Sequence, residues 1–219
     1  MIDNQLKYFL MCLKKSNVII PKPIKMIISG MIIGNDIELS AGKNLFTYIL
    51  TLGDNVDIND VLIGACKGGH LEMVYYAISK GADDLNRGLR IACSYGHKKI
   101  VELLISRGAD DLNRGLENAC IYGHKKIVKL LISKCADDLN YGLENACEYG
   151  HRKIVELLIS GGADNLNSGL NVACRCGHVE IVELLISEGA NNLNWALNHA
   201  YRCDHVEIID LLISKGAKY

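Results

Sequence analysis

The chain has 219 residues, of which 49% are hydrophobic, and a net charge of −1 at pH 7. This balance excludes a strong attraction of the whole chain to nucleic acid or to an acidic membrane surface. No apolar run approaches the ~20 residues that span a bilayer, and lysines interrupt the apolar stretches near the N-terminus, so we expect neither a transmembrane helix nor a signal peptide.

Residues 1–53 carry a weak version of a pattern that becomes regular later in the chain. Residues 42–50 (GKNLFTYIL) align with residues 69–77 at an offset of 27 positions, which predicts the second helix of a degenerate capping repeat. A rival interpretation rests on residues 20–24 (IPKPI), which resemble the start of an F-box. That resemblance implies a segment that recruits a ubiquitin ligase, and both interpretations stay open.

The clearest feature of the sequence is an internal repeat of 27 residues. From Gly81 the unit reads GADDLNRGLRIACSYGHKKIVELLISR, and from Gly108 it reads GADDLNRGLENACIYGHKKIVKLLISK. Six full copies follow one another, at residues 54–80, 81–107, 108–134, 135–161, 162–188 and 189–215. The predicted organisation is an N-terminal segment, residues 1–53, followed by a repeat array over residues 54–219.

Each unit contains two helical patterns. In the unit that starts at Gly81, the first helix is predicted from about residue 86 to 95, with Asn86 as its N-cap and Gly96 as the residue that ends it. The second is predicted from about residue 98 to 106 and is apolar on most of its circumference. One such hairpin cannot bury its apolar surface alone, so neighbouring copies must stack into an all-α solenoid.

The unit resembles the ankyrin repeat. The resemblance rests on Ala-Cys at 92–93, Gly-His at 96–97, the apolar run at 100–105 and Gly-Ala-Asp at 108–110, and this order recurs along residues 54–219. Ankyrin units usually have about 33 residues, a β-hairpin finger and a T-P-L-H start, and the last two are missing here. The resemblance therefore implies an ankyrin-like helical-hairpin solenoid with short or absent fingers. Compact arrays of this kind look like the ankyrin proteins of giant DNA viruses that infect amoebae.

The resemblance implies that a protein partner, a host protein if the chain is viral, binds the concave face formed by the first helices. Some positions of these helices vary while the framework stays constant. The candidate partner-binding residues are Arg87, Arg90, Ser94, Tyr95, Arg114, Glu117, Ile121, Tyr122, Tyr141, Glu144, Glu148, Tyr149, Arg175, Trp195 and Arg202. Among them, Tyr95, Tyr122 and Tyr149 form an aromatic strip, since tyrosine is enriched at interfaces. The alternative, that these tyrosines stack on one another and stiffen the array, stays open.

Five of the nine cysteines recur at intervals of 27 residues, namely Cys66, Cys93, Cys120, Cys147 and Cys174. A disulfide framework would not place its sulfurs at equivalent positions of successive repeats. We predict buried, reduced thiols and hence an intracellular, cytoplasmic protein.

Histidines recur with the same period, at His70, His97, His124, His151, His178 and His205. Stacked helices lie ~8–10 Å apart. Zinc needs nitrogen ligands within about 2.1 Å of one ion, so histidines of adjacent layers cannot share a metal. We predict no metal site, and instead a structural hydrogen bond from each histidine to the turn between helices.

No catalytic motif occurs, and every acid, base and thiol recurs as part of the repeat, whereas an active site needs one convergent, unrepeated cluster. We therefore predict a protein-interaction scaffold or adaptor without enzymatic activity or cofactor. The alternative is a substrate adaptor of a ubiquitin ligase that recruits through the N-terminal segment. The basic pairs at 98–99, 125–126 and 152–153 fit either a patch for an acidic partner or a solvated face. The sequence indicates no oligomeric state.

Overall fold

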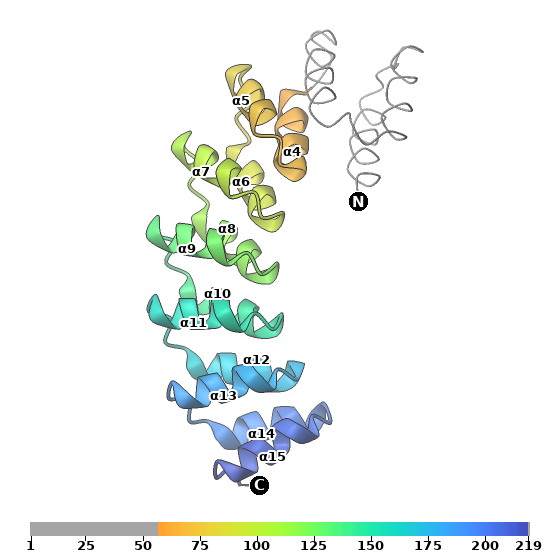
Figure 1. Ribbon diagram of the computed structural model, residues 1–219, viewed down its shortest axis with the longest axis vertical. Coiled ribbons are helices and arrows are strands. Elements are labelled where there is room, and N and C mark those ends of the chain that lie inside the picture. The colour runs from red at the N-terminus through yellow and green to blue at the C-terminus, as the bar shows by residue number, and fades with distance from the viewer. Residues whose placement is uncertain (1–56, 219) are drawn as a thin grey trace, which may run out of the picture. The chain divides into compact units, whose positions relative to one another are not determined.

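The computed structural model describes residues 57–218, which form twelve α-helices and no strand (Figure 1). The prediction of an all-α helical-hairpin solenoid is confirmed for this part of the chain, and none of its residues forms a finger strand. The predicted capping repeat at residues 42–50 and the alternative recruiting segment at 20–24 lie outside the described residues.

The helices alternate between a first and a second helix of each repeat. The first helices are α4 (Ile58–Gly68), α6 (Leu85–Ser94), α8 (Leu112–Ile121), α10 (Leu139–Glu148), α12 (Leu166–Cys176) and α14 (Leu193–Arg202). The second helices are α5 (Leu71–Ser79), α7 (Lys98–Ser106), α9 (Lys125–Ser133), α11 (Arg152–Ser160), α13 (Val179–Ser187) and α15 (Val206–Ser214). The bounds predicted for the second helix, 98–106, are confirmed. The first helix begins and ends one residue earlier than predicted.

The described residues fall into two compact units, residues 57–88 and 89–218. In the first unit, α4 packs against α5 and buries Leu62, Cys66 and Val74 completely. The equivalent positions of the next repeat, Leu89, Cys93 and Val101, are also fully buried.

In the second unit, each first helix from α8 onward packs against its own second helix and against the first helix of the neighbouring repeat. Successive second helices also touch, as α9 does with α11 (Figure 1). The interior repeats with the sequence, because equivalent positions are fully buried in each layer. In the layer formed by α8 and α9, the residues with no exposed surface are Leu116, Ala119, Cys120, Val128 and Leu131.

The asparagine predicted as the N-cap has a different role, which corrects the sequence analysis. The cap position of α8 is Asp111, whose side chain makes no capping hydrogen bond, and Asn113 already lies inside the helix. The Oδ1 atom of Asn113 accepts hydrogen bonds from the main-chain N–H groups of Asp137 and Asp138, at 3.0 and 3.3 Å. Its Nδ2 atom donates to Asp137 Oδ1 at 2.8 Å. The asparagine therefore ties one repeat to the next, because its partners lie across the layer boundary.

The turn after the second helix requires a left-handed backbone. Gly108 has φ 103° there, and Gly162 has φ 109°. Cys135 stands at the equivalent position of the intervening repeat and has φ 68°. A side chain with a Cβ is strained in this conformation, by ~1–2 kcal/mol. The fold therefore imposes this geometry against the preference of the residue.

Candidate partner-binding face

The candidate residues from the sequence lie on the first helices, and none of them is buried. Arg87 belongs to the first compact unit and the other fourteen to the second. Ten are exposed, namely Arg87, Tyr95, Arg114, Tyr122, Tyr141, Glu148, Tyr149, Arg175, Trp195 and Arg202. Five are half-buried, namely Arg90, Ser94, Glu117, Ile121 and Glu144. The positions that vary between repeats are thus accessible to solvent, while constant apolar positions such as Leu116 and Ala119 form the interior.

The three tyrosines occupy equivalent positions at the C-terminal ends of α6, α8 and α10. Their exposed fractions are 48% for Tyr95, 57% for Tyr122 and 51% for Tyr149. The ring of Tyr95 is nearly parallel to that of His97, with centroids 6.5 Å apart. Within residues 89–218, no ring contact joins Tyr122 to Tyr149, so these two do not stack on each other.

Two further aromatic side chains lie near the N-terminal ends of first helices. Tyr141 is 47% exposed, and its hydroxyl donates to Glu117 Oε1 at 3.4 Å, one repeat earlier. Trp195 is 58% exposed and contacts the ring of His199 edge-on, with centroids 5.7 Å apart. Large apolar surface is therefore exposed at both ends of the first helices.

Polar side chains of this face pair with those of the next repeat. The hydroxyl of Ser94 donates to Asn118 Oδ1 at 2.9 Å, and that of Ser168 donates to a carboxylate oxygen of Glu144. The guanidinium of Arg175 lies 3.8 Å from Glu148. Sequence reasoning did not select Asn118. The sequence feature that could have identified Asn118 is the recurrence of asparagine 27 residues later, at Asn145. The side chain of Asn145 is only 8% exposed.

The histidines hold the ends of the first helices in place. The Nε2 atoms of His151 and His178 lie 2.9 Å from the carbonyl oxygens of Ile121 and Glu148. Those carbonyls immediately precede Tyr122 and Tyr149, so each tyrosine stands on a backbone fixed by the following repeat. The predicted structural role is confirmed, but the acceptor lies in the preceding repeat rather than in the turn beside the histidine.

This contact leaves no room for a side chain in the turn below the ring. A Cβ on Gly123 would lie 2.7 Å from Cε1 of His151, and one on Gly177 would lie 2.7 Å from Cε1 of His205. In the last repeat the same turn carries Asp204, with φ 55°. Among residues 57–218, no group of three or more His, Cys, Asp or Glu side chains is arranged to hold a metal ion.

The recurrent cysteines are buried, as predicted, and all of them are free thiols. Burial raises the pKa of the Cys93 thiol from 9.0 to about 12, and it does the same for Cys120. For Cys147 the pKa also rises to about 12, because of burial first and then of the nearby Glu144 and Cys176. A thiol with such a pKa is not a nucleophile near neutral pH. These cysteines therefore act as small apolar residues.

A family model described as "Ankyrin repeats (3 copies)" matches residues 39–115 and 143–219. Among solved structures, the ankyrin repeat domain of human ASB11 is similar, with a TM-score of 0.63 and 28% sequence identity. That match covers 72% of this chain and 84% of the human one. No curated protein matches the sequence. None of the described helices is long and apolar enough to cross a membrane.

Proposed function

The chain belongs to the ankyrin-repeat family, and from that premise we propose that it is a scaffold or adaptor that binds a protein partner across the exposed ends of its first helices. The observation that carries the proposal is the pair Tyr122 and Tyr149. Both side chains are about half exposed, they occupy equivalent positions of adjacent repeats, and the carbonyl group before each is fixed by a histidine. A rigid, exposed aromatic side chain loses little conformational entropy on binding, and for this reason tyrosine often anchors interfaces.

The wider candidate face supplies polar contacts around these anchors. Glu117, Glu144 and Glu148 are already held by side chains of the next repeat. Preorganised polar groups reduce the entropic cost of binding. The proposal assigns the chain no catalytic step, because its polar side chains recur from layer to layer and do not converge on one reacting atom.

We also propose that the protein acts inside a cell. Recurrent free thiols favour a reducing compartment, which is the interior of a cell. The compact repeats resemble those of giant viruses, and with such an origin the partner would be a host protein.

The test combines partner identification with truncation of the aromatic strip. Proteins that co-purify with the full chain from its native cell are identified by mass spectrometry, and their affinities are then measured with purified components. The variant Tyr95→Ala, Tyr122→Ala, Tyr149→Ala should weaken binding of the main partner by about thirtyfold or more. The repeat framework accepts small side chains there, because Cys176 and Cys203 stand at the equivalent positions.

Tyr75→Ala is the matched control. It removes an aromatic side chain of 42% exposure from the second helix α5, which contributes no residue to the proposed face. The control should bind like the unmodified chain. If the triple variant keeps its circular dichroism spectrum and melting temperature and still binds the partner with full affinity, the proposed face is wrong.

A further inference from the structure

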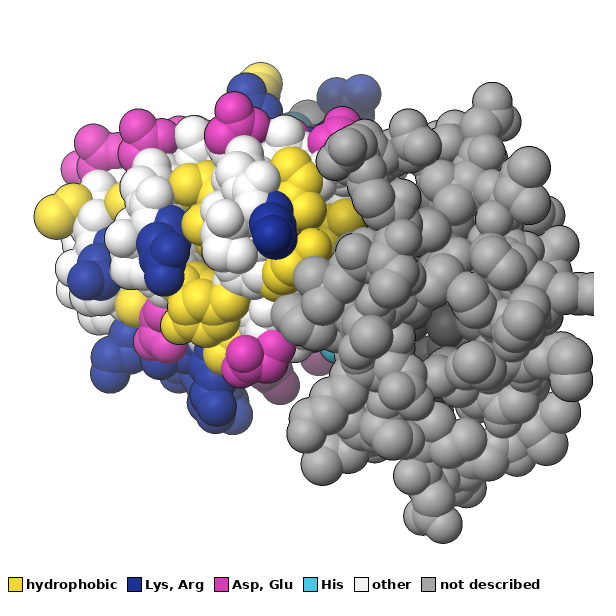
Figure 2. Space-filling view, turned by 90° about the horizontal axis from the view of Figure 1, so that it is seen from above, with side chains coloured by type: hydrophobic (Ala, Val, Ile, Leu, Met, Phe, Trp, Pro, Cys, Tyr) yellow, Lys and Arg dark blue, Asp and Glu magenta, His cyan; other side chains and the backbone are white. Residues whose placement is uncertain are grey.

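The second helices carry a separate charged surface that the proposed face does not include. Basic pairs open three successive second helices, α7, α9 and α11, and a further lysine follows on α9. We call these residues the basic strip: Lys98-Lys99, Lys125-Lys126, Lys129 and Arg152-Lys153. All of them are exposed. In Figure 2, a group of Lys and Arg side chains lies at the lower edge of the described surface, and Asp and Glu side chains line its upper left edge.

At each end of the strip, one basic residue is paired with a glutamate of its own helix, whereas none is paired in the middle. Lys98 pairs with Glu102 at 2.7 Å, and Arg152 pairs with Glu156 at 2.6 Å. On α9 the residue equivalent to those glutamates is Lys129. No acidic side chain among residues 57–218 forms an ion pair with any lysine of α9, whose first five residues include three lysines.

The lysines at the start of α9 do not stabilise the fold. The N-terminal end of a helix is the positive end of its dipole, so a lysine there is mildly unfavourable. Two lysines four residues apart also repel each other. At the position equivalent to Lys126, α13 and α15 carry Glu180 and Glu207, which suit a helix N-terminus. The same framework therefore folds with a more favourable residue, and the lysines on α9 meet some other requirement.

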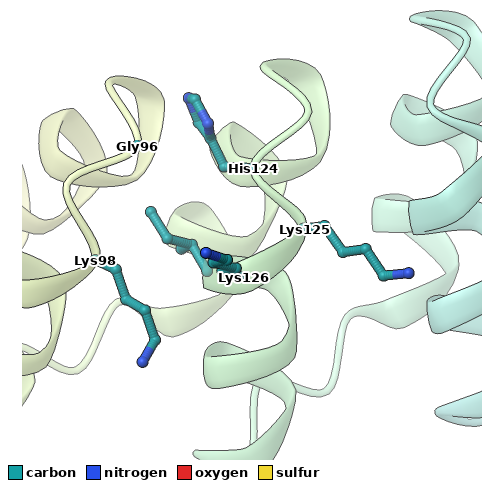
Figure 3. Close-up of a pocket in the computed structure, with 6 residues that line it drawn as sticks. Gly96, Lys98, His124, Lys125 and Lys126 are labelled. Carbon is teal, nitrogen blue, oxygen red and sulfur yellow. The ribbon is translucent and has the colours of Figure 1, made fainter.

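Two shallow hollows lie along the basic strip. A shallow hollow lies where α7 and α9 begin, lined by Gly96, Lys98, His124, Lys125, Lys126 and Ile127 (Figure 3). A second hollow, where α9 and α11 begin, is lined by basic residues that include Lys125, Arg152 and Lys153. Lys125 lines both hollows, and in Figure 3 its side chain extends toward the next layer. The two hollows thus form a short row with positive charge along it.

The dimensions suit an extended peptide. Packed helices lie ~8–10 Å apart, and three residues of an extended chain span ~10 Å. In the polyproline II form of an extended chain, three residues make one turn of ~9 Å, so acidic side chains at every third position lie on one face and each meets one layer of the strip. The charge of neighbouring layers disfavours a longer polyanion. Repeats 81–107 and 108–134 each contain five Lys or Arg and three Asp or Glu, a net +2. The next two repeats contain three Lys or Arg and nine Asp or Glu together, a net −6.

We propose that the basic strip binds a short acidic segment of a protein in extended conformation. The surface lies on the second helices, so this interaction is independent of the partner that the first helices are proposed to bind. Nucleic acid is the less suitable occupant, because a duplex would extend past the strip onto the acidic repeats.

The probe is a fluorescent peptide of about twelve residues with glutamate at every third position and serine and glycine elsewhere. Its neutral analogue has glutamine in place of glutamate. The full chain should bind the acidic peptide and not the analogue, and the affinity should fall steeply between about 0.05 and 0.5 M salt. A duplex oligonucleotide of equal charge should bind more weakly. Equal binding of both peptides, no binding of the acidic one, or tighter binding of the duplex would each overturn the proposal.

The deciding variant is Lys126→Glu with Lys129→Glu. Both replacements have precedents in the same framework, at Glu180 and at Glu102 and Glu156, so the variant should fold. It should lose peptide affinity by about tenfold or more, since two attractive contacts become repulsive. The matched control is Arg107→Glu with Lys134→Glu, which changes the net charge by the same amount. Both residues follow a second helix, and the equivalent residue after α13 is Glu188, so the control should also fold. Affinity should stay within about threefold in the control. If the control loses as much affinity as the strip variant, the binding is general charge attraction and the proposed site is wrong.

Discussion

The Nε2 atom of His124 lies 2.9 Å from the carbonyl oxygen of Ser94, thirty residues earlier in the chain. A carbonyl oxygen only accepts, so Nε2 carries the proton and donates it. The same contact recurs for His151, His178 and His205. Each histidine thus joins the start of a second helix to the end of the first helix in the preceding repeat, so hydrogen bonds as well as apolar contacts connect the layers.

His124→Ala should destabilise the array. The substitution leaves the Ser94 carbonyl without its donor and empties the space next to Gly96, which should cost about 1–3 kcal/mol. For a protein of this size the melting temperature should fall by roughly 2–4 °C per kcal/mol. The control is His199→Ala, because that ring contacts Trp195 instead of a main-chain carbonyl. Equal melting temperatures for the His124 variant and the unmodified chain would contradict the role assigned to this contact.

Cys135→Gly should stabilise the protein. Cys135 has φ 68° where Gly108 and Gly162 stand in neighbouring repeats. Relief of this strain outweighs the extra freedom that glycine gives the unfolded chain, leaving a net gain of about 0.5–1 kcal/mol. Cys203→Gly is the matched control, since it makes the same change at another exposed cysteine whose φ is −113°. Urea denaturation should show a gain for the first variant and none for the second. A loss at position 135 would show that the thiol side chain contributes more than its conformation costs.

Asn140→Asp should weaken the link between repeats more than Asn167→Asp. Asn140 donates its Nδ2 hydrogen to Asp164 Oδ1 at 2.9 Å, so an aspartate there would face another carboxylate. The partner of Asn167 is Asn191, whose amide can turn and donate instead. We expect a loss of about 1–2 kcal/mol for the first variant and less for the second. Equal losses, measured by urea denaturation of both variants, would mean that the charge of the partner is irrelevant.

The buried thiols should make the fold sensitive to alkali. Their folded-state pKa values of about 12 lie above the unfolded value of 9.0, so the folded protein keeps protons that the unfolded chain releases. The stability they contribute is fully present below pH 9 and is lost as the pH rises from 9 to 12. Each thiol contributes up to about 1.4 kcal/mol per pH unit in that window.

This prediction is checked by the S–H Raman band and circular dichroism during an alkaline titration of a Cys12→Ser variant, since Cys12 lies outside the described residues. The five buried cysteines should lose their thiol protons together with the loss of helicity, whereas Cys135 and Cys203 are exposed. Labelling with a thiol reagent at pH 8 should be fast at those two and slow at the buried five. Fast labelling of all cysteines in the native state would contradict their burial.

The sequence predicted the second helices well because their apolar pattern and the glycine after them are local signals. The predicted bounds of the first helix were one residue too late, because Asn86 and its equivalents were interpreted as N-caps. Cap preference describes neighbours in the chain, whereas Asn113 bonds main-chain groups 24 and 25 residues away. The acceptor of each histidine was missed for the same reason, since it lies in another layer. The exposure of the candidate face can be predicted from the repeat pattern. The identity of a partner cannot, because it depends on individual side chains of a repetitive surface.

Asp204 has a consequence for engineering the array as a set of interchangeable modules. At Gly96, Gly123, Gly150 and Gly177, a Cβ would lie 2.7 to 2.8 Å from the histidine of the following module. A synthetic module appended after Lys215 would place its histidine over residue 204 and direct it to the carbonyl of Arg202. Asp204 has the same left-handed backbone, with φ 55°, and carries a Cβ, so we expect such a fusion to require Asp204→Gly before the new module can dock. Copies inserted between existing modules meet no such obstacle, and the array can be lengthened from its interior without altering a junction.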